Sequence, residues 1–185
     1  MKHISWILIF VMMLTGCAGG GDQMDRALAL RSRIQQAQVT FDVELTADYG
    51  DKTYDFAMSC KGDTEGNLFF AVTAPETIAG ISGSVSNGAG KLTFDNQMLA
   101  FEILSDGLIS PVSGPWVMLK SMQSGYLTSC GVEGDGLRLS VDDSYRDKAL
   151  HLDIWLGNED VPQRCEIYWE GRRLLTMCVK NFVIL

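Results

Sequence analysis

Hydrophobic and polar residues alternate most regularly between residues 39 and 49. Every second position of this stretch is apolar, namely Val39, Phe41, Val43, Leu45, Ala47 and Tyr49. Threonine and acidic residues occupy the positions between them. A period of two with one apolar side predicts a β-strand with one face in the core and the other in water.

Shorter stretches with related patterns follow along the chain. Clusters of Gly, Asn and Asp mark turns between them, and Pro75 ends one strand because it has no N–H to donate. The expected strands are 54–60, 68–74, 82–86, 91–95, 98–104, 126–132, 137–142, 149–156, 165–169 and 174–179. Their short connections predict an antiparallel meander of roughly nine to eleven strands.

Two stretches are patterned as helices. Asp22 is an N-cap candidate for a helix over 23–37, whose apolar stripe suits packing onto the domain. A shorter helix is expected from 113–115 to about Ser124, with Pro115 in its first turn and Gly125 as its stop. Its apolar residues cover more than one side, so it is either plain core or lies over an apolar cavity.

The N-terminus has a pattern of its own. The apolar run from Ile4 to Leu14 is too short to span a membrane and has the length of a secretory signal. It ends in Leu14-Thr15-Gly16-Cys17, which resembles the lipobox of bacterial lipoproteins. An ordinary signal peptide followed by a chance cysteine is the alternative interpretation.

The lipobox resemblance implies a processing scheme. Residues 1–16 are then a signal peptide that is removed, 17–22 are the lipidated Cys17 and a tether, and 23–185 form a single domain. The protein is accordingly expected on the extracytoplasmic face of the cell membrane, held there by its lipid. Stable anchoring takes more than one acyl chain.

Composition narrows the set of partners. The chain has 15 basic and 23 acidic residues, and loss of Lys2 with the signal leaves 14 basic residues and a net charge of −9. Such an acidic chain is not expected to bind nucleic acid or to adhere electrostatically to an anionic membrane. The lipid therefore has to provide the membrane attachment.

Cysteine and histidine usage gives little support to catalysis or metal binding. Cys60, Cys130, Cys165 and Cys178 form no CxxC pair and no Cys/His cluster, so neither a metal nor another cofactor is expected. Across the predicted hairpin, Cys165 and Cys178 are either bridged or free, because a shift of one residue in register would separate them.

His151 is the only histidine beyond the signal. Strand parity places it on a polar face beside Asp153. A Ser-His-Asp triad could be drawn through it, but the sequence contains no nucleophile elbow. The chain is therefore not expected to be an enzyme.

The order of elements carries a resemblance to a known family. After the lipobox come one helix and a long meander that is broken by LFFAVTAPETIAGI at 68–81, and VPQRCEIYWEG at 161–171 and Asn181-Phe182 follow near the end. This resembles the LolA/LolB-like lipoprotein-carrier superfamily. It is most similar to the lipid-anchored branch associated with sporulation and germination in spore-forming Firmicutes, of which GerS is an example.

The resemblance implies a mainly β fold. A strongly curved antiparallel sheet would form an incomplete barrel, with the N-terminal helix and the short helix covering its concave face. Carriers of this superfamily bind acyl chains in an apolar cavity there. The residues expected to line it here are Phe56, Phe70, Phe94 and Phe101 from the sheet and Trp116, Met118, Leu119 and Met122 from the short helix.

Two functions follow from the resemblance. One is a binding module whose cavity holds a lipid, an acyl chain or another hydrophobic ligand. The alternative is a non-catalytic lipoprotein that binds and regulates a partner protein in the cell envelope or spore cortex. A continuous cavity under residues 116–122 favours the first, and an interior filled by side chains favours the second.

Overall fold

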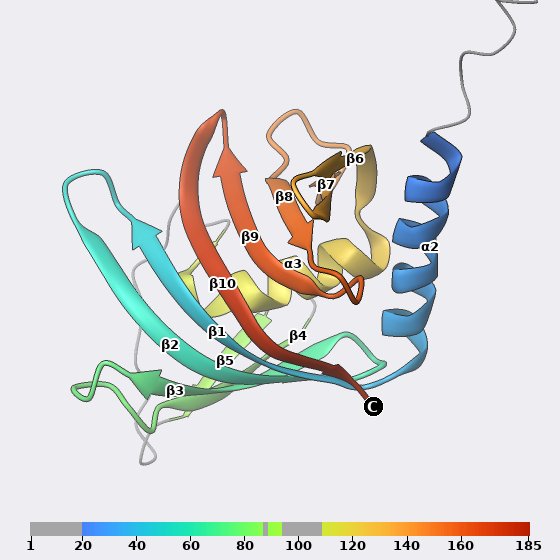
Figure 1. Cartoon of the computed structure of the whole chain (residues 1–185). Helices are drawn as coiled ribbons and strands as arrows, with labels where there is room; N and C mark the ends of the chain where they lie inside the picture. The colour runs from blue at the N-terminus through green and yellow to red at the C-terminus, as the bar shows by residue number, and fades with distance from the viewer. Residues whose placement is uncertain (1–19, 87–88, 94–108) are drawn as a thin grey trace, which may run out of the picture.

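The computed structural model describes residues 20–86, 89–93 and 109–185. They form an antiparallel sheet of ten strands that curves around helix α3, with helix α2 beside α3 (Figure 1). In chain order the elements are α2 (Gly20–Gln36), β1 (Val39–Asp48), β2 (Thr53–Gly62), β3 (Asn67–Ala74), β4 (Ser82–Ser86), β5 (Ala89–Thr93), η2 (Pro111–Ser113), α3 (Gly114–Ser124), β6 (Tyr126–Glu133), β7 (Gly136–Asp142), β8 (His151–Leu156), β9 (Pro162–Trp169) and β10 (Arg172–Ile184). The predicted mainly β fold, an incomplete barrel with helices on its concave face, is confirmed.

The strand order explains why the barrel stays open. Across the sheet it runs β5-β4-β3-β2-β1-β10-β9-β8-β7-β6, so β5 and β6 are the outermost strands among the described residues. From β5 to β1 and from β10 to β6, strands that are neighbours in the sheet are also neighbours in the chain. In the centre, β1 pairs with β10, and Val39 lies opposite Ile184. The two meanders are thus joined by the first and last described strands.

Strand β1 shows how the sequence pattern becomes structure. Val39, Phe41, Val43, Leu45 and Ala47 are each at most 2% exposed, whereas the residues between them face solvent to varying degrees. Asp48 ends the strand, and its carboxylate accepts the N–H of Gly50 at 2.7 Å. Gly50 has a φ of +97°, a conformation that glycine adopts without steric cost. The predicted one-sided strand is confirmed.

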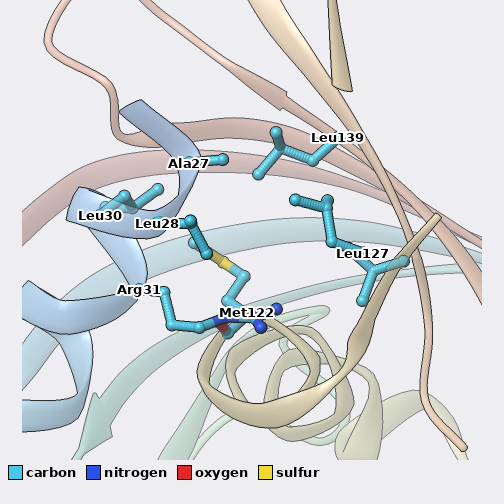
Figure 2. Close-up of a pocket in the computed structure, with 8 residues that line it drawn as sticks. Ala27, Leu28, Leu30, Arg31, Met122, Leu127 and Leu139 are labelled. Carbon is cyan, nitrogen blue, oxygen red and sulfur yellow. The ribbon is translucent and has the colours of Figure 1, made fainter. Parts of the chain in front are cut away.

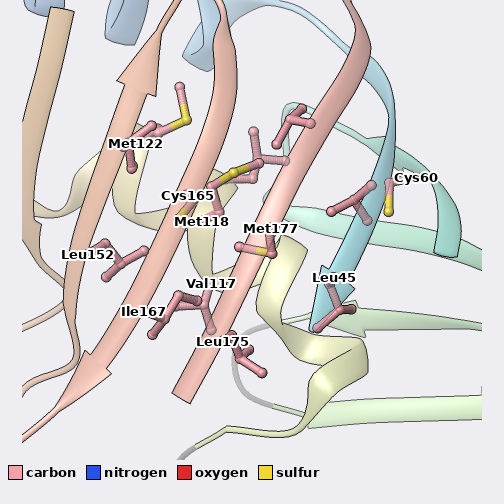
Figure 3. Close-up of a cluster of buried hydrophobic side chains, with 14 of the residues drawn as sticks. Leu45, Cys60, Val117, Met118, Met122, Leu152, Cys165, Ile167, Leu175 and Met177 are labelled. Atoms are coloured by element: carbon pink, nitrogen blue, oxygen red, sulfur yellow. The ribbon is translucent and has the colours of Figure 1, made fainter. Parts of the chain in front are cut away.

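One hydrophobic core lies between the sheet and the two helices (Figure 3). Helix α3 approaches the sheet closely because a glycine lies at two points of their contact, one in the sheet and one in the helix. A Cβ on Gly62 of β2 would lie 2.3 Å from Leu119 Cδ2, and a Cβ on Gly114 would lie 2.7 Å from Leu175 Cδ1. Real Cβ atoms do not approach so closely, so these two glycines set the depth of α3 in the core.

Some element boundaries differ from the expected ones. Helix α2 begins at Gly20, so part of the expected tether over 17–22 is helical, because a glycine pair adjoining a helix can adopt its φ and ψ values. Strand β10 runs to Ile184, well beyond the expected end at residue 179. The expected strand over 98–104 lies outside the described residues. No helix of the described ranges is long and apolar enough to cross a membrane.

The cysteine question is resolved by the register of β9 and β10. Cys165 lies opposite Met177 while Cys178 lies opposite Arg164, so the two thiols point to opposite faces. All four cysteines of the described chain are free, with Cys165 fully buried and Cys178 exposed. The disulfide alternative is therefore wrong. Burial raises the pKa of Cys60 to about 12 and that of Cys165 well above its usual value, so both remain neutral thiols.

Candidate functional site

Helix α3 is the element on which the expected ligand site was placed. A tight turn leads into it, in which the Ser110 N–H donates to Ser113 Oγ and the Ser113 hydroxyl donates to the Ser110 carbonyl, both at 2.9 Å. Pro115 follows in the first turn, where its missing N–H costs nothing. The helix ends at Ser124, and the Gly125 N–H still donates to the Ser121 carbonyl at 2.8 Å. The predicted helix is confirmed.

Four of the expected lining residues are core residues. Met118, Leu119 and Met122 are 0%, 2% and 4% exposed, and Phe70 of β3 is 4% exposed. Figure 3 shows Met118 and Met122 pointing from α3 toward the strands that carry Leu152, Cys165, Ile167 and Met177. All four expected residues belong to one packed cluster. This side of α3 is therefore occupied by the protein's own side chains.

Little space remains where α2, α3 and the β6–β7 hairpin meet. A cavity of about 10 Å³ lies there, lined by Ala27, Leu28, Leu30, Arg31, Met122, Leu127, Leu139 and Val141 (Figure 2). Such a volume accommodates about one water molecule. Arg31 fixes the helices together, because its guanidinium donates to the carbonyls of Met122 at 2.9 Å and Gly125 at 2.8 Å. Burial lowers the pKa of Arg31, although the group remains a cation.

The two partly exposed members of the expected set border larger spaces. Phe56 of β2 lines a groove of about 570 Å³, together with residues of β1, β3 and β10. Trp116 of α3 lines a pocket of about 340 Å³. Phe94 and Phe101 lie outside the described residues. The structure thus places the expected residues in two environments, a packed interior and open spaces next to Phe56 and Trp116.

The pocket at Trp116 lies along one side of α3. Its lining residues are Trp116, Val117, Lys120, Ser121, Ser124 and Asp143, of which the first five recur at helical spacing and the last follows β7. The indole N–H of Trp116 donates to the Gly66 carbonyl in the β2–β3 turn at 2.9 Å, which holds the ring in place. We call this space the α3 pocket. It combines an apolar wall with one cationic, one anionic and two hydroxyl side chains.

A second polar region lies on the opposite face of the sheet, across β7, β8, β9 and β10. Asp153 and Glu166 face each other across the β8–β9 pair, and they are only 4% and 3% exposed. This corrects the expectation that the acidic residues of the strands lie on faces open to water. Their environment could have been suspected from Arg138, Trp155 and Arg164, which strand register places side by side on this face.

Each of the two buried carboxylates has its own set of donors. Arg138 donates to Asp153 at 2.6 Å and Ser140 donates to it at 2.7 Å. Burial raises the pKa of Asp153, but these bonds outweigh burial and hold the pKa below its ordinary value.

The carboxylate of Glu166 is held in the same way. Arg164, Arg173 and the Tyr168 hydroxyl all donate to it. Burial raises the pKa of Glu166 as well, but the bonds from Tyr168 and Arg164 bring it below its usual range. Burial and the bond to Glu166 raise the pKa of Tyr168 to about 12, so Tyr168 stays protonated and continues to donate.

His151 lies in this region, as predicted, but the geometry is not that of a catalytic triad. Its Nδ1 is 2.7 Å from Asp142 Oδ1, and its Nε2 is 3.6 Å from Asp153 Oδ1. The nearby Ser140 hydroxyl donates to Asp153 and not to the imidazole. A nucleophilic serine needs its proton accepted by the histidine. No group of acidic, histidine or cysteine side chains in the described part of the chain could hold a metal ion.

Comparisons with known proteins return similarity of structure only. No protein-family model and no curated protein matches the chain. The chain is similar to a putative outer membrane lipoprotein-sorting protein domain from Vibrio parahaemolyticus, with 10% identity over 88% of this chain and 92% of that one and a TM-score of 0.43. It is also similar to a LolA superfamily protein from Nitrosomonas europaea, with 8% identity over 86% and 93% of the two chains and a TM-score of 0.41. The MucA/MucB complex structure from Pseudomonas aeruginosa gives 10% identity over 89% and 57% and a TM-score of 0.42.

Proposed function

We propose that this protein is a lipid-anchored, extracytoplasmic binding module that holds the apolar part of a ligand against helix α3. One observation carries the proposal. Helix α3 is apolar and buried along most of its length, Val117 included, but Trp116 stays partly exposed and lines the α3 pocket together with Val117 and Lys120. The pocket volume of about 340 Å³ is within the usual range for small-molecule sites, roughly 300–1,000 Å³.

The anchor in this proposal is Cys17. Residues 1–16 would be removed, 17–22 would link the lipid to the domain over 23–185, and the chain would be a lipid-anchored relative of the LolA/LolB-like carriers. The test is metabolic labelling with a fatty-acid analogue in cells that express the full chain. Cys17→Ser should abolish the label and release the protein from membranes or leave it uncleaved. Label that persists on Cys17→Ser contradicts the anchor.

The ligand part of the proposal is tested on the purified domain. Mass spectrometry should detect co-purifying lipid, and a fluorescent fatty acid should bind and raise the melting temperature, because a ligand that binds only the native state stabilises it. Trp116→Ala should weaken binding of the fatty acid. Met118→Ala is the matched control from the packed side of α3. It should destabilise the free protein by about 2–5 kcal/mol and leave the affinity for the fatty acid nearly unchanged.

A second function is favoured by the packed interior. The concave-side residues Met118, Leu119 and Met122 are buried, and the adjoining cavity is only about 10 Å³. A filled interior suits a non-catalytic lipoprotein that binds and regulates a partner protein of the envelope or spore cortex. If no acyl probe binds the wild-type domain and Trp116→Ala changes only its stability, the ligand-binding proposal fails and partner binding is the better account.

A further inference from the structure

We propose that the α3 pocket selects amphiphiles with a singly charged carboxylate head, which Lys120 and Ser121 recognise. This inference deepens the proposed function and rests on it, because it assigns a head-group site to the same pocket. The fatty carboxylate class follows from three features of the pocket: an unpaired cation, a hydroxyl open to the pocket and an apolar wall next to them.

Lys120 is set apart from the other unpaired basic side chains by its burial. Lys52 and Lys61 also lack an ion pair within the described residues, but both are exposed to water. Lys120 is half-buried and lines the pocket, yet within the described ranges its ammonium has neither an ion pair nor a hydrogen bond. A cation that has lost part of its hydration without gaining a partner interacts favourably with an incoming anion.

Ser121 adds a hydroxyl to the wall of the pocket next to Lys120. The residue is 2% exposed, and its side chain makes no hydrogen bond within the described residues. Among these residues the fully buried side-chain atoms without a partner are Arg138 Nε and Trp169 Nε1, so the Ser121 oxygen keeps access to the pocket. The hydroxyl can therefore donate to a head group that enters.

The apolar wall and the charge meet at one end of the pocket. The Trp116 indole is held by the Gly66 carbonyl at 2.9 Å. Lys120 lies one helical turn further, and its Nζ is 3.8 Å from the position that a Cβ would take on Gly66. An amphiphile can therefore place its head at Lys120 and its chain along Trp116 and Val117.

Asp143 limits the charge of that head. This exposed carboxylate also lines the pocket, and it accepts the Leu150 N–H at 2.9 Å and the Ser144 hydroxyl at 3.0 Å. Among the described residues, Lys120 is the single cation that lines the pocket, so a second negative charge on the head would lose hydration without a cation to match it, and Asp143 repels it. A phosphate monoester carries about −1.5 to −2 at neutral pH, whereas a carboxylate carries one charge. The pocket therefore favours the carboxylate over the phosphate.

The test compares three twelve-carbon amphiphiles below their micelle concentrations: dodecanoate, dodecanol and dodecyl phosphate. Their affinities are measured by displacement of a fluorescent fatty acid from the wild-type domain. Dodecanoate should bind on the order of tenfold more tightly than dodecanol, because a charge-assisted hydrogen bond is the stronger kind. Dodecyl phosphate should bind more weakly than dodecanoate.

Substitutions assign the preference to the pocket. Lys120→Met should remove the advantage of dodecanoate over dodecanol while leaving dodecanol binding unchanged, and Ser121→Ala should reduce that advantage in part. Lys52→Met is the matched control, because Lys52 is an exposed lysine without an ion pair in the described residues. This control should retain the full advantage.

The outcomes separate the two proposals. If dodecanoate and dodecanol bind equally, or if Lys120→Met keeps their difference, the head-group inference is wrong and the binding module remains. If dodecyl phosphate binds most tightly, the assignment to carboxylates is overturned. If none of the three amphiphiles displaces the probe and the probe itself does not bind, both the inference and the ligand-binding function fail.

Discussion

Strands β8 and β9 bury side chains on both of their faces, but opposite chemistry stabilises the two buried sets. On the inner face, Leu152, Ile154 and Ile167 are all 0% exposed within the hydrophobic core. On the outer face, Asp153 and Glu166 are 4% and 3% exposed beneath arginine, tyrosine and serine side chains. The inner face is stabilised by non-directional burial, whereas the outer face depends on donors in particular positions.

The outer face of β8 and β9 also constrains strand register, because each buried carboxylate needs a cationic partner. Asp153 and Glu166 lie directly opposite each other, an arrangement that is destabilising for like charges. Arg138 compensates Asp153, and Arg164 and Arg173 compensate Glu166. A slip of one residue between β8 and β9 would separate the carboxylates from their donors. The network therefore specifies strand register, and removing one partner should cost more than the intact network contributes to stability.

The largest effect is expected from placing a charge on the inner face. Ile154→Asp buries a carboxylate that has no donor within the core, and we expect the domain not to fold. Ile154→Val is the control, and it should lower the free energy of unfolding by only about 0.5–1.5 kcal/mol. Circular dichroism and urea unfolding measure both. A folded, cooperative Ile154→Asp domain would show that the two faces do not differ in this way.

Removing a carboxylate from the outer face should have a smaller effect. Glu166→Ala leaves Arg164, Arg173 and Tyr168 without their acceptor, but the arginine side chains are 51% and 54% exposed and can turn to water. We expect a loss of about 1–3 kcal/mol in the free energy of unfolding, read from the urea midpoint at unchanged slope.

A double variant sharpens this prediction. Arg173→Ala in the Glu166→Ala background should cost less than Arg173→Ala alone, because the bond between the two side chains is already gone. Strict additivity of the two losses would mean that the outer face is not a coupled network.

Lowering the pH should remove the stability that the two buried carboxylates of the outer face contribute. The pKa values of Asp153 and Glu166 lie below their usual values in the folded protein, so both contribute stability that is fully present above about pH 4 and is lost as the pH falls through the folded pKa values. Urea unfolding at a series of pH values should show the loss of stability below about pH 4. Asp153→Asn and Glu166→Gln should flatten this dependence, and Ile154→Val should leave it unchanged.

The smallest effect is expected where the outer face is open to water. Lys180 and Glu44 form an ion pair whose side chains are 50% and 60% exposed. Lys180→Met should leave the urea midpoint nearly unchanged, and any change should shrink further in salt. A loss as large as that of Glu166→Ala would contradict the distinction between exposed and covered ion pairs.

The inner face could be predicted from the sequence because alternation of apolar residues and helix-end signals are local patterns. The alternation from Val39 to Tyr49 predicted β1 almost to its ends, and Pro115 and Gly125 marked the limits of α3. Strand β10 was predicted too short because Lys180 and Asn181 end its apolar alternation, although its pairing with β1 continues to Ile184. In β10 a distant partner strand decides the length, and no local pattern reports it.

The candidate site was predicted only in part for a related reason. Helical periodicity places Trp116 on a different side of α3 from Met118 and Met122, but it could not show which side the sheet covers. The covered side depends on the close approach at Gly62 and Gly114. The buried state of Asp153 depends in the same way on Arg138, which comes from another strand.

The pairing of β1 with β10 sets an order of events for the folding chain. Val39 and Ile184 are neighbours in the sheet but are far apart in the sequence. The meander β1–β5 can form once its own strands exist, whereas the other edge of β1 stays unpaired until the last strand is synthesised. Sheets rich in such distant pairings fold over roughly milliseconds to seconds, and during that time β1 presents an open edge to other strands. A chain that stops before β10 keeps this edge permanently, so premature termination turns the centre of the sheet into a site of aggregation.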